Sequence, residues 1–305
     1  MGKIERPIWR FPRGGVESIG GDSPVSFTHV LGILFALMSA ATWGGGDFSG
    51  GLATRRMSQF HALTAGAVSG LAILLCLALL LGEPIPSHTD ILWSALAGVA
   101  AAVGIASLYY ALSVASSAVV APLAAVIGAT VPVLFGSLFE GLPQVTQLLG
   151  FLGGLLGIWL VTRSGSGAGR EDRRGLGSAI TAGIGFGGYF CLIAQVRPGA
   201  VFAPVIVAKI ATLLLGLAVL AMRRERLASL RGVPIALLAG ILDAGGSIFY
   251  LLAQRSLRLD VAAVLSSMYP AFTVILAYFV LGERISAAQW AGVTLCVVAI
   301  ALIAI

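Results

Sequence analysis

The sequence predicts an all-α polytopic membrane protein, with ten transmembrane helices arranged as two inverted five-helix repeats. Composition is the first observation behind this prediction. Of the 305 residues, 58% are apolar and only 10% are charged, and the mean hydropathy of +0.99 lies far outside soluble globular usage. Internal repetition is the second, because the apolar segments of the second half follow the pattern of the first at an offset of roughly 140 residues.

Each predicted span is an apolar segment of about 19 to 24 residues, which is long enough to cross a hydrocarbon core of ~30 Å. The connections between them are mostly short and rich in Gly, Pro and Arg. The spans of the first half are predicted at 30–53, 61–82, 91–113, 116–138 and 143–163. The spans of the second half are predicted at 175–196, 200–222, 233–254, 260–281 and 287–305.

Single residues align between the two halves when one or two small insertions are allowed. The aligned pairs, each at an offset of roughly 140 residues, are Tyr110 with Tyr250, Gly44 with Gly185, Pro132 with Pro270, and Gly150 with Gly292. An odd number of spans in each repeat makes the second copy enter the bilayer upside down, which is the layout of many secondary transporters. The repeat therefore predicts a protein that carries something across a membrane.

The chain divides into four parts. Residues 1–29 are basic and contain several glycines and prolines, so we expect a disordered tail rather than a cleaved signal. Residues 30–163 form the first predicted repeat, 164–174 a polar linker, and 175–305 the second repeat. Ten spans leave no room for a soluble domain.

The basic balance of the chain, with a net charge of +6, is explained by membrane topology rather than by nucleic-acid binding. The arginines are scattered over short loops and form no patch interleaved with aromatic residues. Seven basic residues fall on the side that holds both termini and eleven on the other, which by itself favours termini outside the cytoplasm. The cysteines lie inside apolar spans without paired spacing, so no disulfide framework, metal or cofactor is predicted: Cys76, Cys191 and Cys296.

Three ionisable residues lie deep within the predicted spans, namely Asp47, Lys209 and Asp243. A charge near the bilayer centre costs ~2.5–3.5 kcal/mol, so each should face a cavity or a partner rather than lipid. A structural ion pair is one interpretation and a transport pathway is the other. One lysine cannot compensate two ionised aspartates unless one of them binds a proton or a cation, so Asp47 and Asp243 are candidates for proton coupling.

Asp47 lies within a glycine-rich segment that runs from Trp43 to Gly51. Glycines weaken a helix and allow backbone or ligand to approach closely, so the segment is compatible with a broken first helix. Close helix packing at the glycines is the alternative. If the segment stays helical, Ser39, Trp43 and Asp47 share one face because they recur at steps of four.

A polar stripe is predicted on the eighth span. It consists of residues at i, i+4, i+7 and i+11: Asp243, Ser247, Tyr250 and Gln254. Such a stripe should face a water-filled path. The third span keeps Ser107 and Tyr110 in this frame but has Val103 in place of the aspartate, so the predicted site is asymmetric.

These residues indicate the chemistry of the cargo. One cation beside aromatic and hydroxyl groups suits a carboxylate, two acidic groups suit an amine or a proton, and a zwitterion would satisfy both. The predicted substrate pathway is formed by Trp43, Asp47, Tyr110, Lys209, Asp243, Ser247 and Tyr250.

Several motifs resemble the EamA-type permeases of the drug/metabolite transporter superfamily, over about residues 30–305. The matching pieces are Trp43-Gly44, the run from Tyr109 to the Ala-Ser-Ser stretch at 115–117, and the junction Leu281-Gly282-Glu283-Arg284-Ile285-Ser286 with Gln289 and Gly292. In the first repeat this junction survives only as Glu140-Gly141-Leu142-Pro143 with Gln147 and Gly150, without the basic residue.

The resemblance implies a multi-pass carrier of the bacterial cytoplasmic membrane, often an exporter of amino acids or related metabolites, with a central cavity lined by both repeats. It also implies cytoplasmic termini, which conflicts with the distribution of arginines. The implied partners are a small-molecule substrate and the lipid bilayer. The two fused repeats supply a whole transport unit, so a monomer suffices, while helix periodicity is equally compatible with a homodimer.

Three other function classes are open at this stage. A lipid-linked sugar flippase or nucleotide-sugar carrier would share the architecture but should need more basic residues to hold phosphates. A membrane-embedded enzyme would need a catalytic motif, and none is recognisable in the sequence. A channel is disfavoured because no ring of repeated charges or carbonyls is evident.

Overall fold

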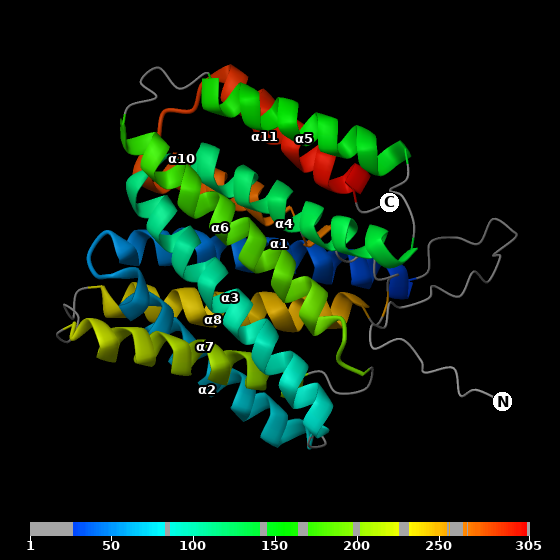
Figure 1. The fold of residues 1–305 in the computed structure, drawn as a ribbon, viewed down its shortest axis with the longest axis vertical. Helices are drawn as coiled ribbons and strands as arrows, with labels where there is room; N and C mark the ends of the chain where they lie inside the picture. Colours follow the sequence, from blue (N-terminus) through cyan, green and yellow to red (C-terminus); the bar gives the residue numbers. More distant parts are fainter. Residues whose placement is uncertain are drawn as a thin grey trace, which may run out of the picture.

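The computed structural model describes residues 27–82, 86–140, 145–163, 170–197, 202–225, 232–254 and 268–303, together with Ser256 and residues 265–266. All regular secondary structure in these ranges is helical. The helices, with the labels of Figure 1, are α1 (Phe27–Thr54), α2 (Gln59–Leu81), α3 (His88–Val114), α4 (Ser117–Glu140), α5 (Val145–Arg163), α6 (Arg170–Ile193), α7 (Phe202–Arg223), α8 (Val233–Gln254), α10 (Tyr269–Leu281) and α11 (Ala287–Ile303).

Six of these helices are long and apolar enough to cross a membrane, and each coincides with a predicted span. They are α1, α2, α3, α6, α7 and α8. In the remaining described parts of α4, α5, α10 and α11, the apolar segments are shorter, at 10 to 17 residues. The structure is therefore that of an all-helical multi-pass membrane protein.

Some predicted boundaries differ from those in the structure. The first helix is not broken, because α1 continues through Trp43 and the glycines that follow it. Helix α6 starts at Arg170, within the segment predicted to be the linker. Most of the predicted tail (1–26), the first part of the linker (164–169) and the start of the ninth span (260–264) lie outside the described residues.

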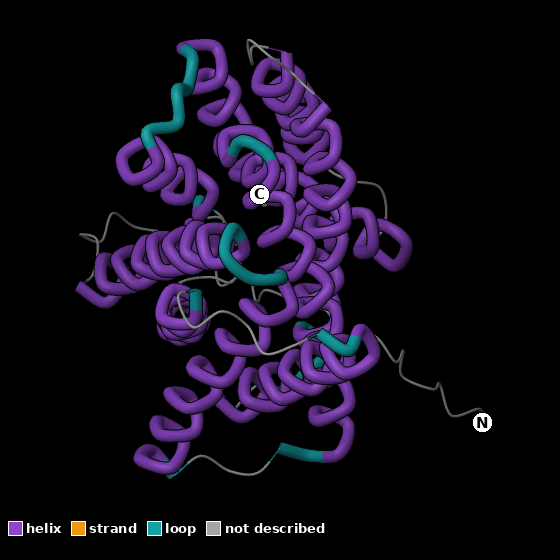
Figure 2. Tube along the Cα trace, turned by 90° about the vertical axis from the view of Figure 1, so that its left-hand side faces the viewer, coloured by secondary structure: helices purple, strands orange, loops and turns teal. Residues whose placement is uncertain are grey.

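The helices are stacked along the long axis of the molecule in the order shown in Figure 1. The pair α5 and α11 packs together at one end, α2 and α7 lie at the other, and α1, α3, α6 and α8 occupy the middle. The described connections between neighbouring helices are short loops, visible as teal segments in Figure 2. The first turn of α1 and the last turn of α11 lie on the same side.

The helix contacts are reciprocal between the two halves. Helix α1 packs on α8 as α6 packs on α3, and α2 packs on α8 as α7 packs on α3. Helix α1 also packs on α10 as α6 packs on α4. Each of these contacts therefore has a partner in which the first-half and second-half helices exchange roles.

The same reciprocity holds for single residues at close contacts. A side chain at Gly98 on α3 would collide with the carbonyl oxygen of Ala208 on α7. In the same way, a side chain at Gly240 on α8 would collide with the carbonyl oxygen of Gly66 on α2. Gly98 therefore corresponds to Gly240, and Gly66 to Ala208, with the halves exchanged. Glycines at these crossings let the backbones approach, as is common where helices pack in lipid.

Helices α1 and α6 make equivalent contacts of another kind. The indole of Trp43 lies over Gly246 on α8, and the ring of Phe186 lies over Gly104 on α3. Trp43 and Phe186 are thus counterparts in the two halves, as are Gly246 and Gly104. An aromatic side chain covers a glycine of the opposite half at both places.

These close contacts correct three of the four predicted residue pairs. Gly44 on α1 lies against the carbonyl oxygen of Tyr269 on α10. The equivalent contact in the other half is that of Gly187 on α6 with the carbonyl oxygen of Gly128 on α4. Gly44 therefore corresponds to Gly187 and not to Gly185. The corrected pairs are Gly44 with Gly187, Pro270 with Ala129, and Tyr250 with Leu108. Tyr110 and Pro132 are therefore not the counterparts of Tyr250 and Pro270. The alignment of Gly150 with Gly292 stays a prediction.

Both halves also meet in polar contacts near the ends of the helices. Glu283, in the turn between α10 and α11, accepts hydrogen bonds from the backbone N–H of Ser117 (3.2 Å) and from its hydroxyl (2.8 Å). A carboxylate is favourable at this position because the first N–H groups of α4 lack partners within the helix. Arg55 lies 3.7 Å from the other carboxylate oxygen of Glu283, so the turn also contacts the end of α1.

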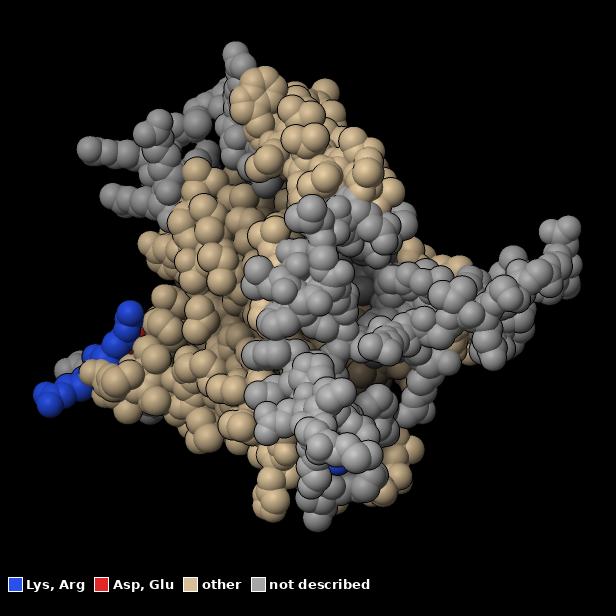
Figure 3. All heavy atoms as spheres, turned by 45° about the vertical axis from the view of Figure 1, so that its right-hand side comes forward, with Lys and Arg blue, Asp and Glu red and all other residues tan. Residues whose placement is uncertain are grey.

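A second inter-half contact lies on the same side as Glu283. Ser58, the N-cap of α2, donates a hydrogen bond of 2.6 Å to Glu225, which follows the end of α7. A third contact lies at the opposite side, where Asp90 near the start of α3 pairs with Arg197 after the end of α6, at 3.2 Å. In the view of Figure 3, Lys and Arg side chains project from one edge of the molecule, beside a broad area of described residues without charge.

Candidate functional site

A cavity lies between the two halves, where α1, α3, α6, α7, α8 and α10 meet. Its empty space, including the part open to the outside, is about 710 Å³. The lining is mainly apolar and aromatic, with a few charged and hydroxyl groups. It consists of Trp43, Asp47, Ala101, Ile105, Phe186, Tyr189, Phe190, Val205, Ala208, Lys209, Thr212, Asp243, Ser247 and Tyr269.

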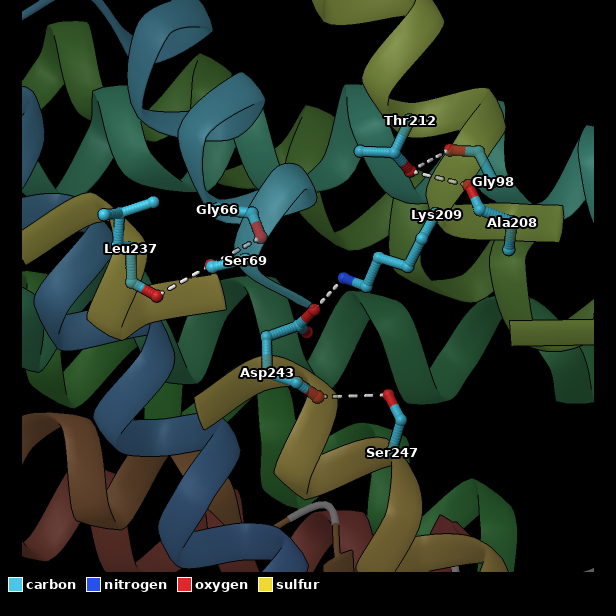
Figure 4. A network of polar contacts seen from close by, with 9 residues as sticks. All are labelled: Gly66, Ser69, Gly98, Ala208, Lys209, Thr212, Leu237, Asp243 and Ser247. Atoms are coloured by element: carbon cyan, nitrogen blue, oxygen red, sulfur yellow. Dashed lines mark hydrogen bonds and ion pairs between the residues drawn. The ribbon is translucent and has the colours of Figure 1, made fainter. Parts of the chain in front are cut away.

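The lining includes an ion pair between Lys209 on α7 and Asp243 on α8 (Figure 4). Both side chains are largely enclosed, at 11% and 22% exposed. The crossing of α7 with α3 holds the lysine in place, because Thr212, one turn further on, donates a hydrogen bond of 3.0 Å to the carbonyl oxygen of Gly98. Ser247 donates to the backbone carbonyl of Asp243 at 3.1 Å, which leaves the Asp243 carboxylate to the lysine.

Asp47 contributes a second carboxylate from α1. Within the described parts of the chain, no side chain forms an ion pair or a hydrogen bond with it. Tyr109 on α3 and Tyr269 on α10 are close enough to interact with it electrostatically. The cavity therefore combines a paired carboxylate at Asp243 with an unpaired one at Asp47.

Aromatic side chains form much of the remaining wall. Trp43 lies against Tyr250, with ring centroids 5.6 Å apart, and Tyr189 lies against Phe190 at the same distance. Aromatic faces attract organic cations and also pack against apolar groups. The arrangement can hold a small molecule with a charged head and an apolar body.

The sequence profile of one protein family matches residues 30–163 and again residues 173–305, which together include nearly all of the described helices. The chain belongs to the EamA-like transporter family. This EamA-like protein is thus a multi-pass membrane transporter of the drug/metabolite transporter type.

Solved structures agree with this assignment at the level of the fold. A protein described only as "Crystal structure of protein" has a TM-score of 0.60 with this chain at 19% identity, covering 90% of this chain and 95% of its own. No curated protein matches the sequence. At such low identity the structural similarity concerns the fold alone.

The cavity of this EamA-like protein contains most of the residues singled out in the sequence. Five of the predicted pathway residues line it together: Trp43, Asp47, Lys209, Asp243 and Ser247. Tyr250 is absent from the lining but its ring lies against that of Trp43. Tyr110 is half-buried and is not among the lining residues, and the side chain of Gln254 lies outside the described part of the structure.

Sequence reasoning missed the aromatic residues of α6 and α10. Phe186, Tyr189 and Phe190 follow one another at helical spacing, in a glycine-rich segment that resembles the one around Trp43. A search of the second repeat for the counterpart of the Trp43 segment could have found them. Tyr269 gave no such signal, because its counterpart on α4 is a glycine, Gly128.

The charged groups have uncharged counterparts in the other half. The alignment that pairs Gly98 with Gly240 and Gly66 with Ala208 also relates two charged residues to alanines: Lys209 to Ala67, and Asp243 to Ala101. This corrects the predicted counterpart of Asp243, because Val103 is 41% exposed on the outer face of α3. The predicted asymmetry of the site nevertheless persists under the corrected alignment.

Proposed function

We propose that this EamA-like protein is a secondary transporter that exports a small amino-acid-like metabolite across a bacterial cytoplasmic membrane by alternating access. The observation that carries the proposal is the unpaired Asp47 carboxylate beside the Lys209–Asp243 pair, in an aromatic cavity between the two halves. Intramembrane charges are costly and mark substrate or ion pathways. An amino group is the cargo feature that suits an unpaired carboxylate flanked by aromatic rings.

The reciprocal helix contacts support ten membrane crossings built as two inverted repeats. Every pair of equivalent contacts exchanges the halves, as at Gly98 with Ala208 and Gly240 with Gly66. In Figure 1, α1 runs from right to left and its counterpart α6 from left to right. Such an arrangement allows two symmetry-related conformations, one open to each side, around a fixed midplane site.

The inter-half polar contacts support alternation between these conformations. Glu283 with Ser117 and Glu225 with Ser58 join the halves on one side, and Asp90 with Arg197 joins them on the other. In a rocking motion, the contacts on the side that opens must separate while the others stay closed. Each of these contacts is a few hydrogen bonds or a single ion pair, and at about 0–3 kcal/mol per interaction such contacts can break during each cycle.

The lining gives less support to a nucleotide-sugar carrier or a lipid-linked sugar flippase. Phosphate groups are usually held by several basic residues. Among the described residues that line the cavity, Lys209 alone is basic, and it already pairs with Asp243. A pyrophosphate would also meet the Asp47 carboxylate, which repels it.

The experiment that tests the proposal compares internal and external pools of amino compounds in bacteria expressing the wild type or Asp47→Asn at equal membrane levels. We expect the wild type to shift a specific compound outward and Asp47→Asn to reduce that shift about tenfold or more, because the loss of an intramembrane charge contact is worth a few kcal/mol. Asp47→Glu is the matched control, since it changes the same position but keeps the carboxylate, and it should retain export.

Two results would contradict the proposal. One is an unchanged set of pools in cells with abundant wild-type protein in the membrane. The other is equal export by Asp47→Asn and the wild type, which would make Asp47 a structural residue.

A further inference from the structure

The charges of the residues that line the cavity restrict the net charge of the molecules and protons that bind there. The described lining contains two aspartates and one lysine, Asp47, Asp243 and Lys209. Since Lys209 and Asp243 neutralise each other, the cavity has a net charge of −1 that resides on Asp47. The repeat counterparts of Lys209 and Asp243, Ala67 and Ala101, add no charge.

An alternating-access protein must pass through a state in which the cavity is closed on both sides. A net charge enclosed in that state is strongly disfavoured, because its hydration is lost. The −1 charge can be cancelled by one proton on Asp47 or by one positive charge on the cargo. A zwitterion has no net charge and so does not neutralise Asp47. The closed cavity can hold a zwitterion only if a proton is bound to Asp47 at the same time.

We propose that the cargo is a small organic cation of net charge +1, which exchanges with a proton at Asp47. The inference rests on the proposed export function and names its substrate class. Export driven by an inward proton gradient requires that cargo and proton occupy the cavity in turn. A cation meets this requirement, because it displaces the proton from Asp47, whereas a zwitterion would travel with the proton in the same direction.

The exchange balances in charge and in atoms. On the inner side the cation binds beside Asp47, and the proton that the carboxyl group held leaves to the interior. On the outer side the cation leaves, and a proton from the exterior takes its place on the carboxylate. One cation moves out for each proton that moves in, and no net charge crosses the membrane.

The surroundings of Asp47 suit this exchange. No cation among the described residues competes with the cargo for it, because the ammonium group of Lys209 is held by Asp243. The rings of Trp43, Phe190 and Tyr269 offer faces for an apolar or aromatic body and for cation–π contact. The ionisable groups that face Asp47 from the neighbouring helices are Tyr109, Tyr189, Lys209, Asp243 and Tyr269.

The test uses purified full-length protein in lipid vesicles and three probes that share a benzene ring and differ in charge. They are phenyltrimethylammonium (+1), phenylalanine (zwitterion) and benzenesulfonate (−1), and the cation is permanently charged so that it does not leak as a neutral base. Vesicles are loaded with one probe, the exterior is acidified, and probe efflux and internal pH are followed together. A potassium gradient with valinomycin then sets the membrane potential.

We expect the acidic exterior to accelerate efflux of phenyltrimethylammonium at least about tenfold, with one proton entering per cation and no effect of membrane potential. Phenylalanine and benzenesulfonate should show no such acceleration. Asp47→Asn should lose the coupling to protons, while Asp47→Glu should keep it and so show that the fold tolerates change at this position.

Three outcomes would overturn the inference. Proton-linked and potential-dependent movement of phenylalanine, with none of the cation, would show a zwitterion carried together with a proton and would leave the proposed function standing. Cation efflux that persists in Asp47→Asn with unchanged proton coupling would remove Asp47 from the exchange. Vesicles in which none of the three probes moves would overturn the proposed function together with the inference.

Discussion

The second-half helices α7 and α8 and their first-half counterparts α2 and α3 share their packing and differ in their charge. Gly98 on α3 contacts the backbone of α7, and Gly240 on α8 contacts the backbone of α2 in the equivalent way, so these two crossings have the same geometry. Yet the positions of Lys209 and Asp243 are occupied by alanines in the other pair. Small residues keep the helix crossings alike in the two halves, whereas the charged pair of Lys209 and Asp243 occurs in the second half and has no charged counterpart in the first.

The largest expected effect comes from breaking the charged pair. Lys209→Ala leaves the Asp243 carboxylate enclosed without a partner, and we expect it to lower the free energy of unfolding by about 3 kcal/mol. Lys209→Met/Asp243→Asn should restore most of that loss, because it makes the α7–α8 pair as uncharged as α2–α3. Denaturation of the detergent-solubilised protein measures both. Equal stability of the single and double variants would show that the pair contributes no more than its alanine counterparts.

The second prediction tests whether the two frames are equivalent. Gly98→Ala and Gly240→Ala each force a methyl group against a backbone carbonyl of the neighbouring helix, and each should cost about 1–3 kcal/mol. The two costs should agree closely, because the contacts are related by exchange of the halves. Gly177 provides a control, since a side chain there would meet no atom within 4 Å. A large cost at only one of the two crossings would break the equivalence.

A third, smaller effect separates the paired carboxylate from the unpaired one. Asp47→Asn removes a charge that has no ion-pair partner in the described structure, so we expect the protein to gain about 1 kcal/mol of stability while transport is lost. Asp47→Asn should raise the free energy of unfolding, whereas Lys209→Ala should lower it, and this difference in sign distinguishes the unpaired carboxylate from the paired one. It is checked by measuring unfolding and transport on the same preparation. A loss of stability in Asp47→Asn would point to a structural role for the carboxylate.

The smallest effect is expected at the periphery. Asp90→Asn weakens the pair with Arg197, whose side chain is 54% exposed, and should change the free energy of unfolding by less than about 1 kcal/mol. High salt should diminish the difference from the wild type, because exposed ion pairs are screened. An effect as large as that of Lys209→Ala would mean that the inter-half contacts, rather than the cavity, dominate stability.

The sequence predicted more of the helices than of their pairing. Apolar length alone was enough to place α2, α3 and α7, and the cost of buried charge was enough to select Asp47, Lys209 and Asp243 for the cavity. The residue-by-residue alignment of the two halves was harder to predict, because glycine and tyrosine recur so often that several offsets give plausible matches. The close contacts between helices, such as those of Gly98 and Gly240, show which residues of the two halves correspond.

The continuity of α1 shows a second limit of sequence reasoning. A run of glycines lowers helix propensity by about 1 kcal/mol per residue relative to alanine, which made a broken helix a reasonable expectation. In the structure, Gly44 and Gly46 instead admit the backbones of α10 and α8 at close range. Tertiary packing of this kind compensates the low propensity, and it cannot be seen in the local sequence.

The cap that Glu283 provides for α4 has a consequence for synthesis of the chain. The carboxylate and the backbone N–H of Ser117 are separated by 166 residues, so the ribosome must add most of the second half before the bond can form. At elongation rates of about 5–20 residues per second, this interval is roughly 8 to 33 s. During that time the start of α4 waits without its partner, and the first half reaches its final packing only once the last hairpin has been inserted.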